Sequence, residues 1–239
     1  MLSYSEIELA REPQLRHSEY LVRCGRRGLA YRLIKCADSW ALAVRMGREY
    51  PVYQCDSRYC EYCGPRRAAR FRRTYGPVLE SLVNEGYRLS HLVLTTRNIP
   101  ELERGHSDRL LQAFNKILRS NPLKGRVAGA FAQYEIEFND DWHAHLHVIL
   151  IYKKCIEQPA ISEAWYRLTG SRQVDIRKLL YDSNDLESVH NSISTIMNYV
   201  CKHTSFDDRA FERVFESTYN KKLVRTYGLI RKRYNGIQY

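Results

Sequence analysis

The sequence of 239 residues contains no apolar run near the length of about 20 residues that a membrane-spanning helix needs. Acidic side chains occur in the first eleven positions, where a secretion signal has a basic start and an apolar centre. Internal repeats and low-complexity linkers are also missing, which argues against a repeat array. We therefore expect a cytoplasmic protein without a membrane partner, folded as one domain with or without a small appended module.

Acidic residues are scarce relative to basic ones. The chain has 27 Asp and Glu against 38 Lys and Arg, a formal net charge of +11, and 12% aromatic residues. This balance favours a polyanionic partner, and nucleic acid is the first candidate. Two basic clusters are local enough to bind phosphates. They are Arg66, Arg67, Arg70, Arg72 and Arg73, and Lys221, Lys222, Arg225, Arg231, Lys232 and Arg233.

The seven cysteines are odd in number, and three of them fall within nine residues. This pattern indicates metal ligation in a reducing compartment better than it indicates a disulfide framework. Cys55, Cys60 and Cys63 form a Cys-x4-Cys-x2-Cys run. Structural zinc takes four ligands in a tetrahedron, so a fourth is needed, and we predict Cys36, with Cys24 as the alternative.

The composition of the chain changes near residue 75. Residues 1–75 are rich in cysteine and arginine, and alternating stretches at 29–34 and 40–44 predict short strands. We expect Zn²⁺ to stabilise this small module, which would then present the first arginine cluster to DNA. Residues 76–239 are expected to form the second domain.

Residues 76–239 alternate between helical and strand patterns. Helices are predicted at 77–85, 107–119, 161–168 and 188–203, and strands at 91–96, 128–138, 143–152 and 173–176. Asn139, Asp140 and Asp141 join the two long strands as a hairpin. This order predicts an α+β fold with an antiparallel central sheet and helices on one face.

Three alternating histidines, at positions 143, 145 and 147, precede a run of aliphatic residues. In a strand, a period of two places the three imidazoles on one face and Ala144 and Leu146 on the other, against a core. Imidazole is a common ligand of divalent metals, and two rings one strand step apart can hold a single ion. The pattern therefore predicts a metal-binding strand.

A hard ion such as Mg²⁺ or Mn²⁺ usually takes an oxygen ligand beside its histidines. Glu135 and Glu137 lie on one face of the preceding strand, and cross-strand neighbours are close enough to share an ion. We favour Glu135 and keep Glu137 as the alternative. His143 is a third ligand, a DNA contact or a solvated residue in this interpretation.

Tyr199 and Lys202 are three residues apart in the last predicted helix, and so lie on one helical face. A tyrosine hydroxyl has an ordinary pKa of about 10 and is a poor nucleophile unless a cation or a metal stabilises the phenolate. Lys202 is placed to supply that charge. Taken alone, this spacing is common in amphipathic helices.

Together, four motifs in chain order resemble those of the HUH endonuclease superfamily, and most closely the rolling-circle replication initiators, or Rep proteins, of small plasmids and phages. The motifs are His91–Thr96, Glu135–Phe138 with Trp142–Leu150, Met197–Lys202, and Arg225–Gly228. The plasmid Reps also carry a similar cysteine group before the first motif. The resemblance implies the ferredoxin/RRM-like HUH fold for this domain.

The resemblance further implies a site-specific endonuclease and strand transferase that cuts single-stranded origin DNA, with single-stranded or supercoiled origin DNA as its partner. His145, His147 and Glu135 would hold Mg²⁺ or Mn²⁺, and Tyr199, assisted by Lys202, would attack the scissile phosphate. The products would be a 5′-phosphotyrosine and a free 3′-hydroxyl that primes a host polymerase, with a host helicase as a second partner. Arg225 belongs to the last motif and is expected to contact DNA.

Thr195 is a departure from the pattern, because some plasmid Reps have a glutamate one turn before the nucleophile and some phage Reps a second tyrosine. The route of the terminating cleavage therefore stays open. A single-tyrosine HUH transposase or relaxase is an alternative, although relaxases tend to place the tyrosine ahead of the histidines. A non-catalytic, zinc-stapled DNA-binding protein is another, and its binding would not depend on Tyr199 or on divalent metal.

Overall fold

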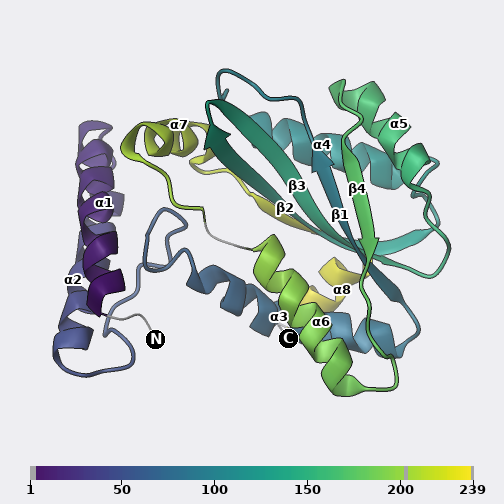
Figure 1. Ribbon diagram of the computed structural model, residues 1–239, viewed down its shortest axis with the longest axis horizontal. Coiled ribbons are helices and arrows are strands. Elements are labelled where there is room, and N and C mark those ends of the chain that lie inside the picture. The colour runs from purple at the N-terminus through teal and green to yellow at the C-terminus, as the bar shows by residue number, and fades with distance from the viewer. Residues whose placement is uncertain (1–3, 202–203, 238–239) are drawn as a thin grey trace. The chain divides into compact units, whose positions relative to one another are not determined.

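A computed structural model describes residues 4–201 and 204–237 of the chain (Figure 1). The described residues form two compact units. The first draws on residues 1–68 and 202–216, and the second on residues 69–201 and 217–239. The zinc and nuclease roles predicted for 1–75 and 76–239 stay predictions, because a division into compact units tests neither role.

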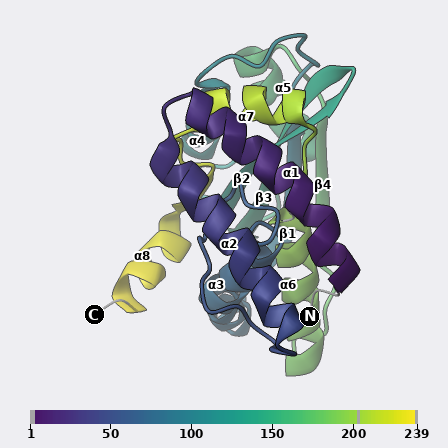
Figure 2. The same ribbon diagram turned by 90° about the vertical axis from the view of Figure 1, so that its left-hand side faces the viewer.

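The first unit is built on a pair of helices, α1 (Tyr4–Arg23) and α2 (Arg27–Arg45), which lie side by side (Figure 2). Gly25 turns the chain between them with a φ of +73°, a conformation that glycine adopts without strain. Helix α7 (Asp208–Thr218) is joined to α1 by an ion pair between Arg16 and Asp208 at 2.7 Å. The unit is therefore helical.

The strands predicted at 29–34 and 40–44 are wrong, because both stretches lie within α2. The buried residues Leu33, Ala37 and Trp40 follow one another at intervals of three and four, which is the period of a helix. Over the 19 residues of α2 this period outweighs the local alternation that suggested strands.

The second unit is organised around a five-stranded antiparallel sheet with the order β4-β1-β3-β2-β5 (Figure 1). The prediction of an α+β fold with an antiparallel sheet is confirmed. Four of the strands and two helices follow one another as β-α-β-β-α-β, the ferredoxin-like order. These elements are β1 (Arg88–Thr95), α4 (His106–Arg119), β2 (Val127–Asn139), β3 (Asp141–Tyr152), α5 (Gln158–Thr169) and β4 (Val174–Lys178). The others are α3 (Arg66–Asn84), α6 (Leu186–Val200), β5 (Val224–Tyr227) and α8 (Gly228–Ile237).

Helices α4 and α5 lie on one face of the sheet. Phe114 of α4 meets Tyr227 edge-on, and the indole of Trp165 in α5 donates to the carbonyl oxygen of Thr95. Helices α3 and α6 lie against the opposite face, where Phe71 of α3 packs on Phe131 of β2. This second face carries the alternating histidines. None of the described helices has the length and apolar content that crossing a bilayer requires.

Gly228 joins β5 to α8 with a φ of +56°, and a Cβ there would lie 2.1 Å from the carbonyl oxygen of Ala128. Because the obstacle is backbone, we expect Gly228→Ala to lower the free energy of unfolding by about 3 kcal/mol, from left-handed strain and overpacking together. Urea denaturation measures this change. Gly125 is the control, since its φ is +72° and a Cβ there meets nothing within 4 Å. Gly125→Ala should lower the free energy of unfolding by only about 1 kcal/mol. Equal losses in the two variants would contradict the close backbone contact at Gly228.

Candidate active site and metal sites

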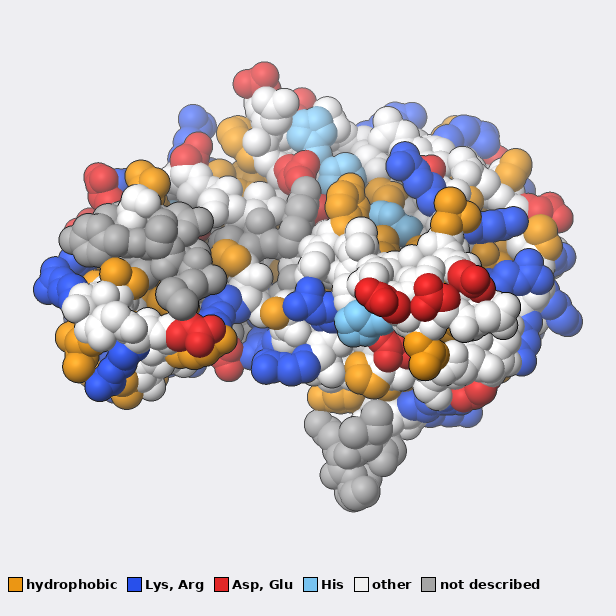
Figure 3. Space-filling view, turned by 60° about the horizontal axis from the view of Figure 1, so that its bottom comes forward, with side chains coloured by type: hydrophobic (Ala, Val, Ile, Leu, Met, Phe, Trp, Pro, Cys, Tyr) orange, Lys and Arg blue, Asp and Glu red, His pale blue; other side chains and the backbone are white. Residues whose placement is uncertain are grey.

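The register of the sheet places the alternating histidines beside the two glutamates. In the β2–β3 pair, Glu135 lies opposite His145 and Glu137 lies opposite His143. The short hairpin turn at Asp140, with a φ of +62°, fixes this register. Histidine side chains reach the surface on the face shown in Figure 3.

The closest polar contact in this group joins His147 to Glu135. The Nε2 atom of His147 lies 2.5 Å from Oε2 of Glu135, and only 4% and 8% of the two residues are exposed. A buried carboxylate beside an imidazole orients the ring and makes it a better metal ligand. Of the two candidate glutamates, the structure brings Glu135 into contact with a histidine of the motif. Glu137 lies one strand step further out.

His91 of β1 is a site residue whose role the sequence reasoning missed. Its Nε2 atom lies 3.2 Å from Nδ1 of His147, and the two rings stack with their centroids 5.4 Å apart. Burial, followed by the charge of His147, lowers the pKa of His91 to about 4, so this imidazole is neutral near pH 7. The available signal was alternation, since His91, Val93 and Thr95 share one face of β1.

His145 lies one step along β3 from His147, with its ring centroid 6.1 Å from that of His147. Its Nδ1 atom is 3.0 Å from Oγ1 of Thr95, the residue opposite it on β1. Burial lowers the pKa of His145, with a further contribution from His147, which favours the neutral, metal-binding form.

Tyr199 lies in the last turn of α6, with about half of its surface exposed. Its ring meets those of His147 and His91 edge-on, with centroids 5.4 and 5.3 Å away. Arg72 of α3 donates to Oδ1 of Asn198, the residue before Tyr199, at 2.8 Å. The predicted nucleophile is therefore next to His147, one of the predicted metal ligands. Lys202 lies outside the described residues.

The donor set of His145, His147 and Glu135 suits a divalent ion in kind, since it combines two imidazoles with a carboxylate. The potential ligand atoms of these three residues do not lie as close together as those of a closed metal site. Among the described residues, the one group that brings three or more potential ligand atoms within 4.8 Å of one another is a group of four cysteines. Solvent and substrate oxygens would complete an open catalytic site.

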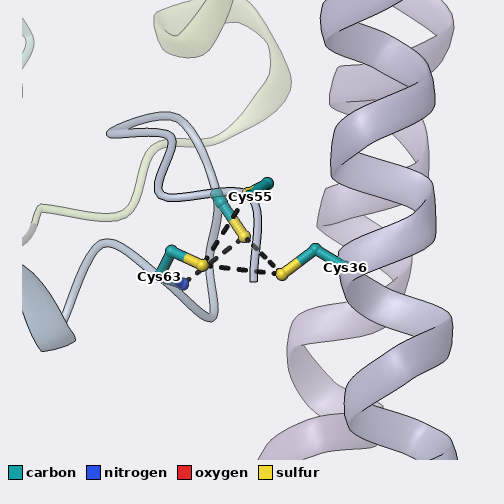
Figure 4. A group of neighbouring side chains, drawn as sticks. Cys36, Cys55 and Cys63 are labelled. Carbon is teal, nitrogen blue, oxygen red and sulfur yellow. Dashed lines mark hydrogen bonds between the residues drawn. The ribbon is translucent and has the colours of Figure 1, made fainter. Parts of the chain in front are cut away.

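Four buried cysteines form that group, which we call the cysteine cluster: Cys36, Cys55, Cys60 and Cys63. Cys36 projects from α2, and the others come from the loop before α3 (Figure 4). The Sγ–Sγ distances are 3.5 Å for Cys36–Cys63, and 3.7 Å for both Cys55–Cys63 and Cys36–Cys60. Zinc–sulfur bonds of 2.3 Å in a tetrahedron place the sulfurs about 3.8 Å apart. The cluster therefore could hold a zinc ion.

Hydrogen bonds from neighbouring residues hold the cysteine cluster in position. The buried amide of Gln14 donates to Sγ of Cys60 at 3.3 Å and accepts from the backbone of Glu61 at 3.0 Å. Hydrogen bonds from neighbouring thiols, the largest from Cys36, lower the pKa of Cys63 and favour its thiolate. Cys24, the alternative fourth ligand, is exposed and outside the cluster.

The arginines predicted to bind DNA have different surroundings. The guanidinium of Arg66 lies over the rings of Trp40 and Tyr50, at 5.0 and 4.9 Å from their centroids. Arg225 lies on the sheet face away from the histidines and pairs with Asp108 at 3.2 Å. The rest of the first cluster lies along α3. DNA contact by these arginines stays a prediction.

A comparison with known families places this geometry in context. The family described as Replication protein matches residues 48–238. The chain belongs to this family. The resemblance to replication initiators that the motifs indicated is thereby confirmed. No curated protein and no solved structure matches the chain. The match includes Cys55, Cys60 and Cys63 of this replication protein and leaves out Cys36.

Replacing Cys36 tests the cysteine cluster. We expect Cys36→Ser to lose most of the bound Zn²⁺ and several kcal/mol of stability, because structural zinc contributes about 10 kcal/mol or more to folding. Zinc content by atomic absorption and a thermal melt measure the two effects. Cys24 is exposed and lies between α1 and α2. Cys24→Ser is therefore the matched control, and this variant should keep its zinc. Full zinc retention by Cys36→Ser would contradict the four-cysteine site.

Proposed function

We propose that the protein is a rolling-circle replication initiator that cuts single-stranded origin DNA with Tyr199 as the nucleophile. The observation that supports this function most strongly is the position of Tyr199, whose ring meets that of His147 edge-on. A half-exposed phenol beside two imidazoles and a buried carboxylate is open to a substrate on one side and to a metal site on the other.

The metal site would use His145, His147 and Glu135. A bound Mg²⁺ or Mn²⁺ would withdraw charge from the non-bridging oxygens of the scissile phosphate. Residues of the chain itself would orient the ligands and the nucleophile. Glu135 orients His147, Thr95 orients His145 through its Nδ1 atom, and α6 holds the phenol against the same face.

The reaction exchanges one phosphate ester for another. The phenolic oxygen of Tyr199 forms a bond to phosphorus and releases its proton, while the bond from phosphorus to the 3′ oxygen breaks. The 3′ oxygen takes up a proton and becomes the 3′-hydroxyl that primes a host polymerase. A later transesterification reverses the chemistry and releases the displaced strand as a circle.

In this proposal Zn²⁺ in the cysteine cluster is structural. It would join α2 to the loop before α3, and it takes no part in the cleavage. The origin DNA is the direct partner, and a host helicase and polymerase act on the nicked product. The basic surface would attract the DNA and make its binding sensitive to salt.

Replacing the nucleophile tests the proposal. We expect Tyr199→Phe to reduce covalent linkage to single-stranded origin DNA by at least about 1,000-fold, because phenylalanine keeps the ring but has no attacking oxygen. A denaturing gel of the Mn²⁺ reaction measures the linked species, and EDTA should abolish it. Tyr166→Phe, in the exposed face of α5, is the matched control and should react normally. Undiminished linkage by Tyr199→Phe would exclude Tyr199 as the nucleophile.

A further inference from the structure

Helix α6 carries the proposed nucleophile close to its end. Tyr199 is the residue before Val200, at which the helix ends. The last four carbonyl groups of a helix have no partners within it, and the final turn therefore tends to fray. A nucleophile in that turn needs a contact from outside the helix to hold it in one position.

Two pairs of side chains join α6 to α3. Nη1 of Arg72 donates to Oδ1 of Asn198 at 2.8 Å, and Nδ1 of His190 lies 2.7 Å from Oε1 of Glu80. The two contacts are eight residues apart on each helix, and they pair in opposite order along the chain. At a rise of 1.5 Å per residue, this separation is about 12 Å. Two contacts so far apart fix both the position of α6 along its axis and its rotation about that axis.

Helix α3 is itself held by the strand that carries Glu135. The rings of Phe71 and Tyr75 meet that of Phe131 on β2, with centroids 5.8 and 5.1 Å away. Phe131 and Glu135 share one face of β2, because they are four residues apart in a strand. The same strand therefore places the proposed metal ligand Glu135 directly and the helix of the nucleophile through α3.

The contact made by Arg72 is the one next to the nucleophile, since Asn198 immediately precedes Tyr199. A guanidinium near this end of a helix also interacts favourably with the helix dipole, whose negative end is the C-terminus. The side chain that follows Asn198 is the phenol whose ring meets that of His147 edge-on. The last turn of α6 therefore sets where the attacking oxygen lies.

We infer that Arg72 is a positioning residue, which holds the last turn of α6 through Asn198 and so keeps the phenol of Tyr199 beside His147. This inference rests on the proposed function, because it gives Arg72 a role in the attack by Tyr199. It differs from the phosphate contact expected of the first arginine cluster. A displacement of about 1 Å at the reacting atoms is enough to slow a reaction about 100-fold.

Removing the donor tests the role of Arg72. We expect Arg72→Met to slow the single-turnover linkage of Tyr199 to saturating single-stranded origin DNA about 10- to 100-fold, with little change in the dissociation constant measured in EDTA. Methionine keeps an unbranched apolar stem and is a good helix former. Arg72→Lys restores a donor and should recover much of the rate.

Arg167 of α5 provides the matched control for the lost charge. It is also a helical arginine with a bonded partner, since its Nε atom donates to Oε1 of Glu163 at 3.2 Å. Arg167→Met removes the same charge from the opposite face of the sheet and should react at the normal rate. Equal slowing by Arg72→Met and Arg167→Met would overturn the inference, because net charge would then explain both.

Removing the acceptor should have the same effect as removing the donor. Alanine is a better helix former than asparagine, so slow linkage by Asn198→Ala would not come from a loss of helix propensity in α6. In a double-mutant cycle, Arg72→Met combined with Asn198→Ala should be as slow as either single variant, within about twofold. Losses that multiply would show two separate roles and overturn the inference.

The kinetic outcomes also distinguish positioning from DNA contact. An unchanged rate for Arg72→Met at saturating DNA would overturn the inference. Weaker DNA binding together with that unchanged rate would instead identify Arg72 as a phosphate contact. Linkage by Arg72→Lys that is as slow as that by Arg72→Met would also count against a hydrogen bond as the cause.

Hydrogen exchange tests the position of α6 without reference to cleavage. The backbone N–H of Cys201 donates to the carbonyl oxygen of Met197 at 3.0 Å and closes the last turn. We expect Arg72→Met to speed exchange of the amides of residues 198–201 about fivefold, as measured by mass spectrometry. Unchanged exchange would overturn the role of Arg72 alone. Failure of the unaltered protein to become linked to DNA would instead overturn the proposed function.

Discussion

The antiparallel pairing of β2 with β3 is the constraint on which the candidate active site depends. It sets Glu135 opposite His145 and lets the carboxylate reach His147 at 2.5 Å. A slip of one residue would turn the whole histidine row to the face covered by α4 and α5. The apolar partners of the row, such as Leu146, are fully buried against α4 and α5, so the hydrophobic core protects the register that the chemistry needs.

In the function we propose, the histidine face is catalytic and the cysteine cluster is structural. The histidine face is partly open, and on it burial lowers the pKa of His145 while the phenol of Tyr199 meets the ring of His147 edge-on. The cysteine cluster is closed and buried, with sulfur spacings close to those of tetrahedral zinc. Cys36 comes from α2, outside the family match, and joins three cysteines that lie within it.

Much of the second unit could be predicted from the sequence, because period-two alternation and the Asn139–Asp141 turn are local signals, and so is the cysteine spacing of the first unit. The strands predicted within α2 are wrong, because alternation over five or six residues is a weaker signal than the helical period over all 19 residues of α2. The contact of His91 with His147 joins residues 56 apart, and no local pattern encodes it. The same holds for Arg66, whose packing on Trp40 appears only once the chain is folded.

The most direct test of the account is to identify the residue that becomes linked to DNA. The protein is allowed to react with single-stranded origin DNA and Mn²⁺, digested with trypsin and nuclease, and analysed by fragmentation mass spectrometry. The account predicts a nucleotide joined through its 5′ phosphate to Tyr199, within a peptide that also contains Tyr181 as an internal comparison. A nucleotide on Tyr181 or on any other residue, or a link through a 3′ phosphate, would contradict it.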